Sequence, residues 1–300
     1  MSTQANLRTV VRGAYDIQKL RIQMGNRIVG NFKAKLGQEP GHKEAELDTE
    51  GKAILATIRA QFKKITDGVK SFPLRKSFKG DEVISDYTEL CLVSQYVDLE
   101  RYEDQHFRRL GTILRGYRVW SEFLKGVKGV GPAMGGVIIS EIDIHKAKYP
   151  SSLWAYAGLD VAGDGGGRSR RKEHLVEIEY TGRDGTPAKR VGITFNPFLK
   201  TKLVGVLASS FLRAGENPYS KVYGDYKHRM ENHVKYGVQN DGEKDDAGRK
   251  ITSKLRRHNM AMRYMVKRFL VDLYKAWRAI EGLPVAPEYS EAKLGMTHVA

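Results

Sequence analysis

Hydrophobic residues in the first 125 positions recur at three- and four-residue steps, with polar residues between them. This period predicts amphipathic helices over residues 5–37, 49–69 and 81–125. Glycine and proline interrupt the pattern around residues 37–42 and 71–80, where we expect loops. The third helix would be long enough to form a coiled-coil-like hairpin or the helix of a dimer.

The second half of the chain alternates between helical patterns and one strand pattern. Helices are predicted over residues 197–213, 217–230 and 249–281. Between them, alternating residues around Asp184-Gly185 predict a β-hairpin at about 174–195. The expected fold class is therefore mainly α, with long helices, a helix-hairpin-helix and one small inserted β-hairpin.

The helix-hairpin-helix is predicted from Leu124 to Ile139, where the order is hydrophobic, Gly129, hydrophobic, Gly131 and Pro132. Both glycines permit positive φ and close approach of the backbone. Amides of the hairpin and of the next helical turn lack internal partners and suit a DNA phosphate. The candidate contacts are Lys128, Gly129, Val130, Gly131 and Ala133. The alternative is a turn that only joins two packed helices.

Charge supports a polyanionic partner, since the chain has 51 Lys and Arg against 35 Asp and Glu, a net charge of +16. Nucleic acid is the polyanion that such a field most often attracts, although charge alone does not separate DNA from RNA. Two segments concentrate the basic residues. The glycine-rich loop contributes Arg168, Arg170, Arg171 and Lys172, and the last helix contributes Arg256, Arg263 and Lys267; for each, simple solvation is the alternative.

Several classes of protein are disfavoured by the composition. No apolar run approaches the ~18 residues of a membrane helix, and residues 1–6 have no apolar core of a signal peptide. The single cysteine, Cys91, excludes an internal disulfide and a multi-cysteine zinc site. We expect a cytoplasmic, nucleoid-associated protein without a metal site, and we interpret the acidic residues at 98–104 as ion pairs on a helix.

Three motifs together resemble a known family. They are the long helix with its Gly-Val-Gly-Pro hairpin, the segment Tyr149-Pro-Ser-Ser-Leu-Trp-Ala-Tyr-Ala-Gly-Leu159, and Asn196-Pro-Phe-Leu-Lys200. Over roughly residues 90–281 the chain resembles the C-terminal transposase domain of the bridge-RNA-guided insertion-sequence transposases, which pair a DEDD nuclease domain with a catalytic serine. The resemblance implies DNA recombination and transposition by a mobile element, with DNA and a structured RNA as partners.

The chain departs from that family at both catalytic elements. The family has a Ser-Ser-Gly-type loop after Tyr-Ala-Gly-Leu, whereas glycines occupy residues 163 and 165–167 here. Ser169 is a weak candidate for a displaced nucleophile, and an ordinary loop serine is the alternative. The family's RNase H-like domain binds two Mg²⁺ ions, but residues 1–80 here are predicted to be helical and basic.

These observations predict four regions: an N-terminal helical region (1–80), a long connecting helix (81–123), a transposase-like DNA-binding domain (124–281) and a tail (282–300). The predicted function is binding of the backbone and shape of duplex or branched DNA, without catalysis by this chain alone and without a cofactor. One alternative is an active transposase or recombinase, which would use Mg²⁺. The other is a structured-RNA-binding protein. A homo-oligomer through the long helix is compatible with each.

Overall fold

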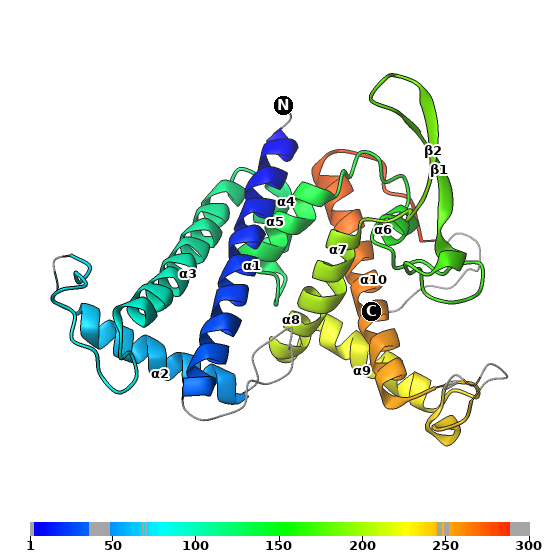
Figure 1. Cartoon of the computed structure of the whole chain (residues 1–300). Helices are drawn as coiled ribbons and strands as arrows, with labels where there is room; N and C mark the ends of the chain where they lie inside the picture. The colour runs from blue at the N-terminus through cyan, green and yellow to red at the C-terminus, as the bar shows by residue number, and fades with distance from the viewer. Residues whose placement is uncertain are drawn as a thin grey trace. The chain divides into compact units, whose positions relative to one another are not determined.

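The computed structural model describes residues 3–35, 49–67, 69, 71–244, 248 and 252–288. The protein is mainly α-helical, with a single small antiparallel sheet (Figure 1). The loop predicted around residues 37–42, residue 249 at the predicted start of the last helix, and most of the tail lie outside these residues. Thr252 and Ser253 are not helical, so the last helix begins at Lys254, later than predicted. The elements are α1 (Thr3–Lys35), α2 (Thr49–Thr66), α3 (Tyr87–Leu114), α4 (Arg118–Glu122), α5 (Pro132–Glu141), α6 (Pro150–Tyr156), β1 (Val176–Thr181), β2 (Pro187–Gly192), α7 (Pro197–Thr201), α8 (Ala208–Arg213), α9 (Pro218–Glu231) and α10 (Lys254–Ile280).

Two compact units divide the chain. One consists of Thr9–Gly111, and the other of Met1–Arg8 with Thr112–Ala300. The first unit contains most of α1, α2 and most of α3, so the N-terminal helical region and much of the long connecting helix of the sequence analysis share one unit. Its apolar core is formed by residues of these three helices and by one loop residue, Ile84. The helical members include Ile28, Phe32, Ile58, Leu90 and Val93.

The acidic residues of α3 pair with basic residues of the same unit. Asp98 pairs with Arg101 and Glu100 with Arg59, at 2.9 and 2.8 Å. Glu103 accepts from Arg21 on α1, and Asp104 pairs with Arg108. Ion pairs therefore account for this acidic segment, which confirms that interpretation.

The long helix predicted over residues 81–125 is shorter than expected at both ends. The carboxylate of Asp81 accepts from the amides of Val83 and Ile84, each at 2.8 Å, and so stabilises a loop. Asp86 then accepts from two amides of the first turn of α3, as an N-cap does. At the other end α3 stops at Leu114, and α4 begins only at Arg118. The Asp86 cap therefore sets a later start of α3, and the helix is interrupted around Gly116, although apolar residues continue at helical spacing across both places.

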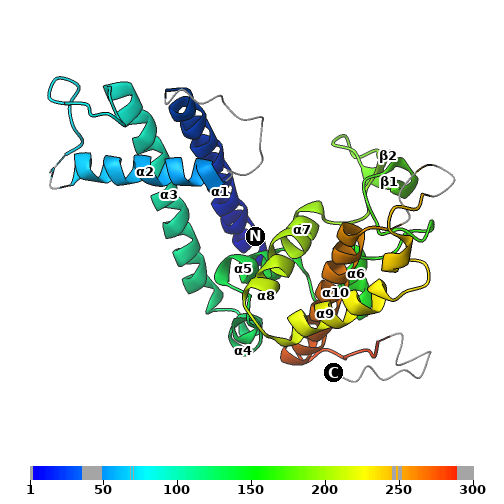
Figure 2. The same cartoon turned by 90° about the horizontal axis from the view of Figure 1, so that it is seen from below.

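In the second unit α10 is the central element. It packs against α4, α6, α8 and α9 (Figure 2). Its buried face includes Phe269, whose ring meets those of Phe211 and Tyr219 at centroid distances of 5.4 and 5.6 Å. Between α7 and α8 the chain stays helical but widens into a π turn, Lys202–Leu207, a feature that is common near functional sites. No helix in the described parts of the chain is long and apolar enough to span a membrane.

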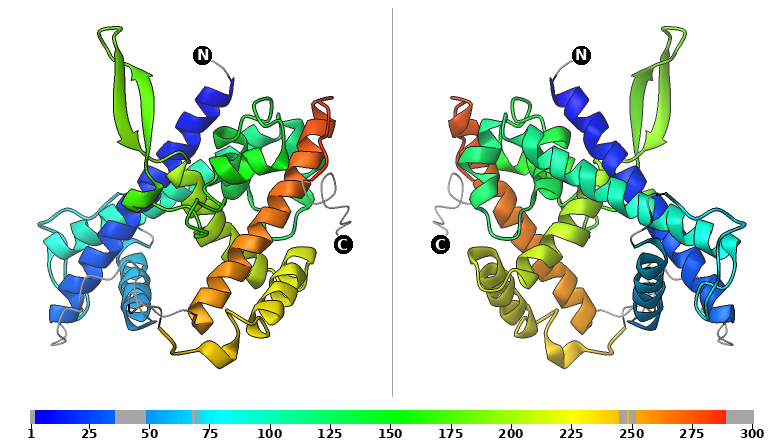
Figure 3. Two further views of the ribbon diagram at one scale, coloured as in Figure 1. Left: turned by 90° about the vertical axis from the view of Figure 1, so that its right-hand side faces the viewer. Right: turned by 90° about the vertical axis from the view of Figure 1, so that its left-hand side faces the viewer.

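The β-hairpin forms where the alternating pattern predicted it. β1 and β2 pair from Val176↔Gly192 to Thr181↔Pro187, and the ribbon projects away from the helices of its unit (Figure 3). Asp184 accepts from the amide and hydroxyl of Thr186, and Gly185 has φ +81°. The turn chemistry of Asp-Gly therefore fixes the hairpin.

Candidate nucleic-acid interface

The glycine-rich loop after α6 closes into a small hairpin. The amide of Ala162 donates to the Gly166 carbonyl at 2.8 Å, and Gly165 has φ +72°. The amide of Arg168 donates to the Asp160 carbonyl at 3.1 Å. This closure returns Arg168 to the end of α6, where two of its guanidinium nitrogens bind Asp160 Oδ2 at 2.7 and 3.0 Å.

Three further cations surround this ion pair. Lys200 of α7 donates from Nζ to the Arg168 carbonyl. A Cβ on Gly167 would collide with the guanidinium of Arg263, so this glycine leaves room for the end of the Arg263 side chain beside the loop. Lys267, one helical turn further along α10, holds its Nζ 5.1 Å from the ring centre of Trp154. We call Arg168, Lys200, Arg263 and Lys267 the cationic cluster.

The charged forms of the two lysines in the cationic cluster are disfavoured. The pKa of Lys200 is lowered to about 8, first by burial and then by the charges of Arg263, Arg168 and Arg170, while Asp160 opposes them. Burial also lowers the pKa of Lys267, with Arg263 as the next cause. Because the nearest carboxylate is already paired with Arg168, an added anion would stabilise the charged lysines.

The cluster joins two sets of residues that the sequence analysis predicted separately. Arg168 comes from the loop, and Arg263 and Lys267 come from the last helix. Arg170 acts on it through its charge, whereas Arg171 faces Asp164 at 3.8 Å. Arg256 lies elsewhere, with its guanidinium carbon 5.4 Å from the ring centre of Tyr236. Lys172 is exposed at the start of a short 3₁₀ turn.

Lys200 was missed by sequence reasoning, although the motif that contains it was noted. Asn196 caps α7, since its side chain accepts from the Leu199 amide at 3.1 Å. The same side chain donates to Glu141 of α5 at 2.7 Å. The Asn-Pro pair therefore fixes the first turn of α7 and the position of Lys200 four residues later. The sequence feature that could have indicated Lys200 is a basic residue at the end of a helical turn that an Asn-Pro pair begins.

In the predicted helix-hairpin-helix, the first part of the hairpin faces the protein. Gly129 has φ +97° and packs on Phe211, and its carbonyl accepts from Ser210 Oγ at 2.8 Å. Val130 is buried, and Lys128 donates to the Glu216 carbonyl at 3.1 Å. These contacts would also be present in a hairpin that only joins two packed helices, so they do not by themselves indicate DNA binding.

The second part of the hairpin is open. Gly131 is the N-cap of α5, with φ −93° and no side-chain cap, and a Cβ there would meet nothing within 4 Å. Positive φ is therefore needed at Gly129 but not at Gly131, which corrects the expectation for the second glycine. Ala133 is half-buried in the first turn of α5. The amides at this end are the ones that a phosphate could reach.

Gly131→Val tests this open end. We expect the variant to fold, with its free energy of unfolding lowered by about 1 kcal/mol or less. The cost arises because valine is less favourable than glycine at an N-cap position, while φ and the space at Gly131 suit any residue. Duplex DNA affinity should fall about tenfold or more, since branched methyl groups would displace a charge-assisted amide–phosphate bond. Fluorescence anisotropy with a labelled duplex measures the change. Gly224→Val, at an exposed and open position of α9, is the control; equal affinities for the two folded variants would remove the hairpin from the interface.

Ser169 lies in a second arrangement within the same loop. Its Oγ is 2.9 Å from His174 Nδ1, and His174 Nε2 is 3.0 Å from Asp164 Oδ2. The Ser169 amide also donates to Nδ1, so Nε2 carries the proton shared with Asp164. The bond from His174 is the largest cause that lowers the pKa of Asp164. The imidazole is buried and oriented as a base for the hydroxyl.

The serine arrangement has a structural interpretation as well. Arg171 donates to Ser169 Oγ from its amide and its Nε, at 3.3 and 3.2 Å. These bonds and the histidine together fix the turn that leads into β1. Asp164 and His174 were not singled out from the sequence, because no local pattern marks residues five positions before and after Ser169 as its partners.

Within the described ranges, no group of three or more His, Cys, Asp or Glu side chains is arranged to hold a metal ion. The glycine-rich loop presents cationic side chains and the N-terminus of α5 presents backbone amides, and both kinds of group bind anions. Comparison with known proteins gave no match among family models, curated proteins or solved structures.

Proposed function

We propose that this protein binds DNA through the phosphate backbone, with the cationic cluster as its main contact, and that it does so without catalysis by this chain alone. The observation that carries the proposal is the cluster of four cations around one carboxylate that is already paired. Such a group of like charges is unfavourable in the free protein. A phosphate would provide the missing anion.

The open N-terminus of α5 is a second element that supports the proposal. Amides there and the cationic side chains both recognise phosphate oxygens rather than base edges, so binding would depend on backbone and shape. The resemblance to insertion-sequence transposases agrees with DNA as the partner. A mobile-element or nucleoid-associated role follows from this proposal.

The salt dependence of duplex binding tests the proposed function. A labelled 30-base-pair duplex should bind with an affinity that falls linearly on logarithmic axes as salt rises, with a slope set by the phosphates neutralised. Several contacts predict a slope of about −3 or steeper. Failure to bind duplex DNA at low salt would contradict the proposal. Stronger binding of a structured RNA of equal charge would favour the RNA-binding alternative.

Lys200 gives the proposed interface a pH dependence. Its pKa of about 8 in the free protein means that it loses its charge as pH rises through that value. A bound phosphate favours the protonated form, so affinity is full well below pH 8, falls by up to about twofold at pH 8 and by up to about tenfold at pH 9. Anisotropy titrations between pH 6.5 and 9 at constant ionic strength measure this decrease.

Lys200→Arg is the matched variant for the pH dependence, because a guanidinium stays charged throughout this range. We expect it to reduce the decrease strongly and to leave the smaller share that belongs to Lys267, whose pKa is also lowered. An unchanged pH profile in Lys200→Arg would show that Lys200 does not contact the DNA.

A second candidate function is DNA strand transfer, as in an active transposase or recombinase. The observation that favours it is the chain of contacts from Ser169 through His174 to Asp164. A serine attacks a phosphodiester when a base takes its proton and donors stabilise the developing charge. Here His174 would be the base, oriented by Asp164, and Arg171 would be the donor.

A covalent adduct distinguishes the two candidates. Attack by Ser169 Oγ would break one P–O bond of the phosphodiester, release one strand end as a free hydroxyl and leave the protein attached to the phosphate of the other end. Denaturing electrophoresis detects this adduct on supercoiled or branched DNA, with and without Mg²⁺. We expect no adduct from the purified chain. An adduct that disappears in Ser169→Ala but persists in Ser121→Ala, an exposed serine of α4, would replace the binding-only proposal with strand transfer.

A further inference from the structure

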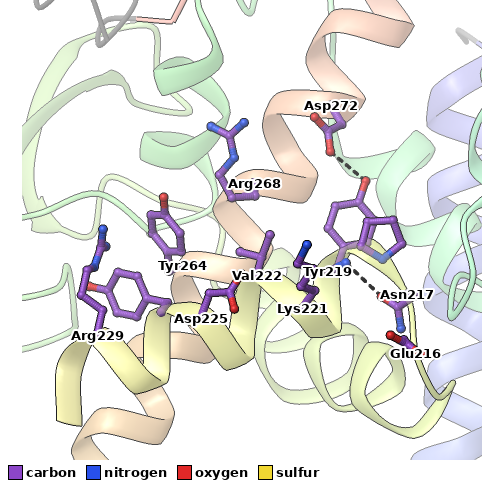
Figure 4. A pocket seen from close by; sticks show the side chains of 12 residues that line it. Glu216, Asn217, Tyr219, Lys221, Val222, Asp225, Arg229, Tyr264, Arg268 and Asp272 are labelled. Atoms are coloured by element: carbon purple, nitrogen blue, oxygen red, sulfur yellow. Dashed lines mark hydrogen bonds between the residues drawn. The ribbon is translucent and has the colours of Figure 1, made fainter. Parts of the chain in front are cut away.

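A groove of about 780 Å³ lies between α9 and α10, outside the cationic cluster. Figure 4 shows that Tyr264, Arg268 and Asp272 project into it from α10, and that Val222, Asp225 and Arg229 come from α9. Tyr226 of α9 also lines the groove. Its size is within the usual range for sites that bind small organic groups.

Two tyrosines form a stacked pair at one side of this groove. The ring centres of Tyr226 and Tyr264 are 4.3 Å apart, with 24° between the planes. The guanidinium carbon of Arg229 is 4.7 Å from the centre of Tyr226. Both rings are only half-buried, unlike Tyr219, which is buried against Phe211 and donates to Asp272 at 3.0 Å. Arg229 is also 5.6 Å from the centre of Tyr264, and we call this partly exposed pair of rings the stacking surface.

The charges that line the groove are of both signs and equal in number. Lys221, Arg229 and Arg268 are balanced by Glu216, Asp225 and Asp272. Three carboxylates disfavour a phosphate, and three cations disfavour a cationic ligand. A flat neutral group with donors and acceptors on its edge fits this lining. A guanidinium has five N–H donors, and the bond from Arg268 Nη1 to Glu288, at 2.7 Å, uses one of them.

The groove and the cationic cluster are on neighbouring faces of α10. Arg263 and Lys267 are four residues apart and share one face. Tyr264 and Arg268 each follow them by one residue, which is a rotation of about 100° around the helix. A DNA strand whose phosphates contact the cluster would therefore run beside the stacking surface.

We propose that the groove binds an unpaired DNA base, which stacks on the Tyr226–Tyr264 pair and is hydrogen-bonded at its edge by Arg268 and Asp225. This inference rests on the proposed DNA binding and adds to it a site for a base displaced from the duplex. Aromatic side chains bind unpaired bases in this way with little sequence preference. The site would make single-stranded or distorted DNA a better ligand than its phosphates alone predict.

Two single strands separate base binding from phosphate binding. One is a labelled twelve-nucleotide oligodeoxyadenylate, and the other is the same length with abasic sites at every internal position. We expect the wild-type protein to bind the base-bearing strand about 5- to 100-fold more tightly. Tyr264→Ala should remove this difference, and Tyr264→Phe should keep it because the ring remains.

A second variant, which fills the groove, tests the base site in case Tyr264→Ala does not fold. Val222→Trp occupies the groove without removing either tyrosine and should also remove the preference for the base-bearing strand. The double variant Arg263→Glu/Lys267→Glu should weaken both strands alike and preserve their ratio. Equal binding of the two strands by the wild-type protein would overturn the base site while leaving the proposed backbone binding intact.

If the wild-type protein binds neither strand, the proposed function fails and the groove is tested by itself with adenosine in equilibrium dialysis. Adenosine binding that is lost in Tyr264→Ala would support the base site. Absence of adenosine binding would overturn it.

Discussion

Reversing the charges of both Arg263 and Lys267 to glutamate is expected to weaken duplex DNA binding by about a hundredfold or more. Each charge-assisted hydrogen bond contributes about 1.5–3 kcal/mol, and about 1.4 kcal/mol corresponds to a tenfold change. The reversed charges would also face Asp160, which stays paired with Arg168. The logarithmic salt slope should become shallower by about 2, one for each phosphate that the variant no longer neutralises. Anisotropy titrations over a series of salt concentrations measure both changes.

Arg256→Glu is the control on the same helix. Arg256 precedes Arg263 by two turns of α10 and lies over Tyr236 rather than in the cationic cluster, so its reversal should change affinity and slope much less. Thermal unfolding of both variants checks that α10 still packs. If the double variant keeps the wild-type slope, the cluster is not the DNA contact, and the open end of the hairpin at Gly131 becomes the stronger candidate.

The longer helices of the fold could be predicted from sequence because each has its own apolar period, and side-chain caps mark the starts of α9 and α10. α9 begins after Asn217, whose side chain accepts from the amides of Tyr219 and Ser220 at 3.0 Å. α10 begins after Ser253, which accepts from the Arg256 amide at 3.1 Å. The break between α3 and α4 was missed, because apolar residues continue in period across Gly116 while the backbone does not.

The candidate site could be predicted only in parts. Basic residues at 168–172 and on the last helix were visible as local charge, but their meeting depends on tertiary packing, in which the guanidinium of Arg263 lies against Gly167. That contact joins residues almost a hundred positions apart, and no local pattern encodes it. The contacts of Ser169 with His174 and Asp164 likewise depend on how the glycine-rich loop closes, which spacing alone does not determine.

Gly158→Ala is expected to have the largest effect on stability, about 2–5 kcal/mol. Gly158 ends α6 with φ +63°, a conformation that costs an L-residue about 1–2 kcal/mol. Its Cβ would also come within 2.6 Å of the Phe195 ring, and overpacking costs about 1–3 kcal/mol. In a unit of this size the melting temperature should fall by about 5–15 °C. Thermal unfolding followed by circular dichroism measures it.

Gly158→Ala should be destabilising because Gly158 forms the turn that ends α6 and leads to Asp160 of the cationic cluster's ion pair. The Leu159 amide donates to the Trp154 carbonyl at 2.8 Å and the Gly158 amide to the Ala155 carbonyl at 3.0 Å, a Schellman turn that requires a left-handed residue. The turn directs Asp160 toward Arg168, so DNA affinity should fall with stability. Gly163→Ala, in the same loop without positive φ and with open space around its Cβ, should change the melting temperature by no more than about 2 °C. Equal melting temperatures for Gly158→Ala and Gly163→Ala would show that the turn does not support the unit.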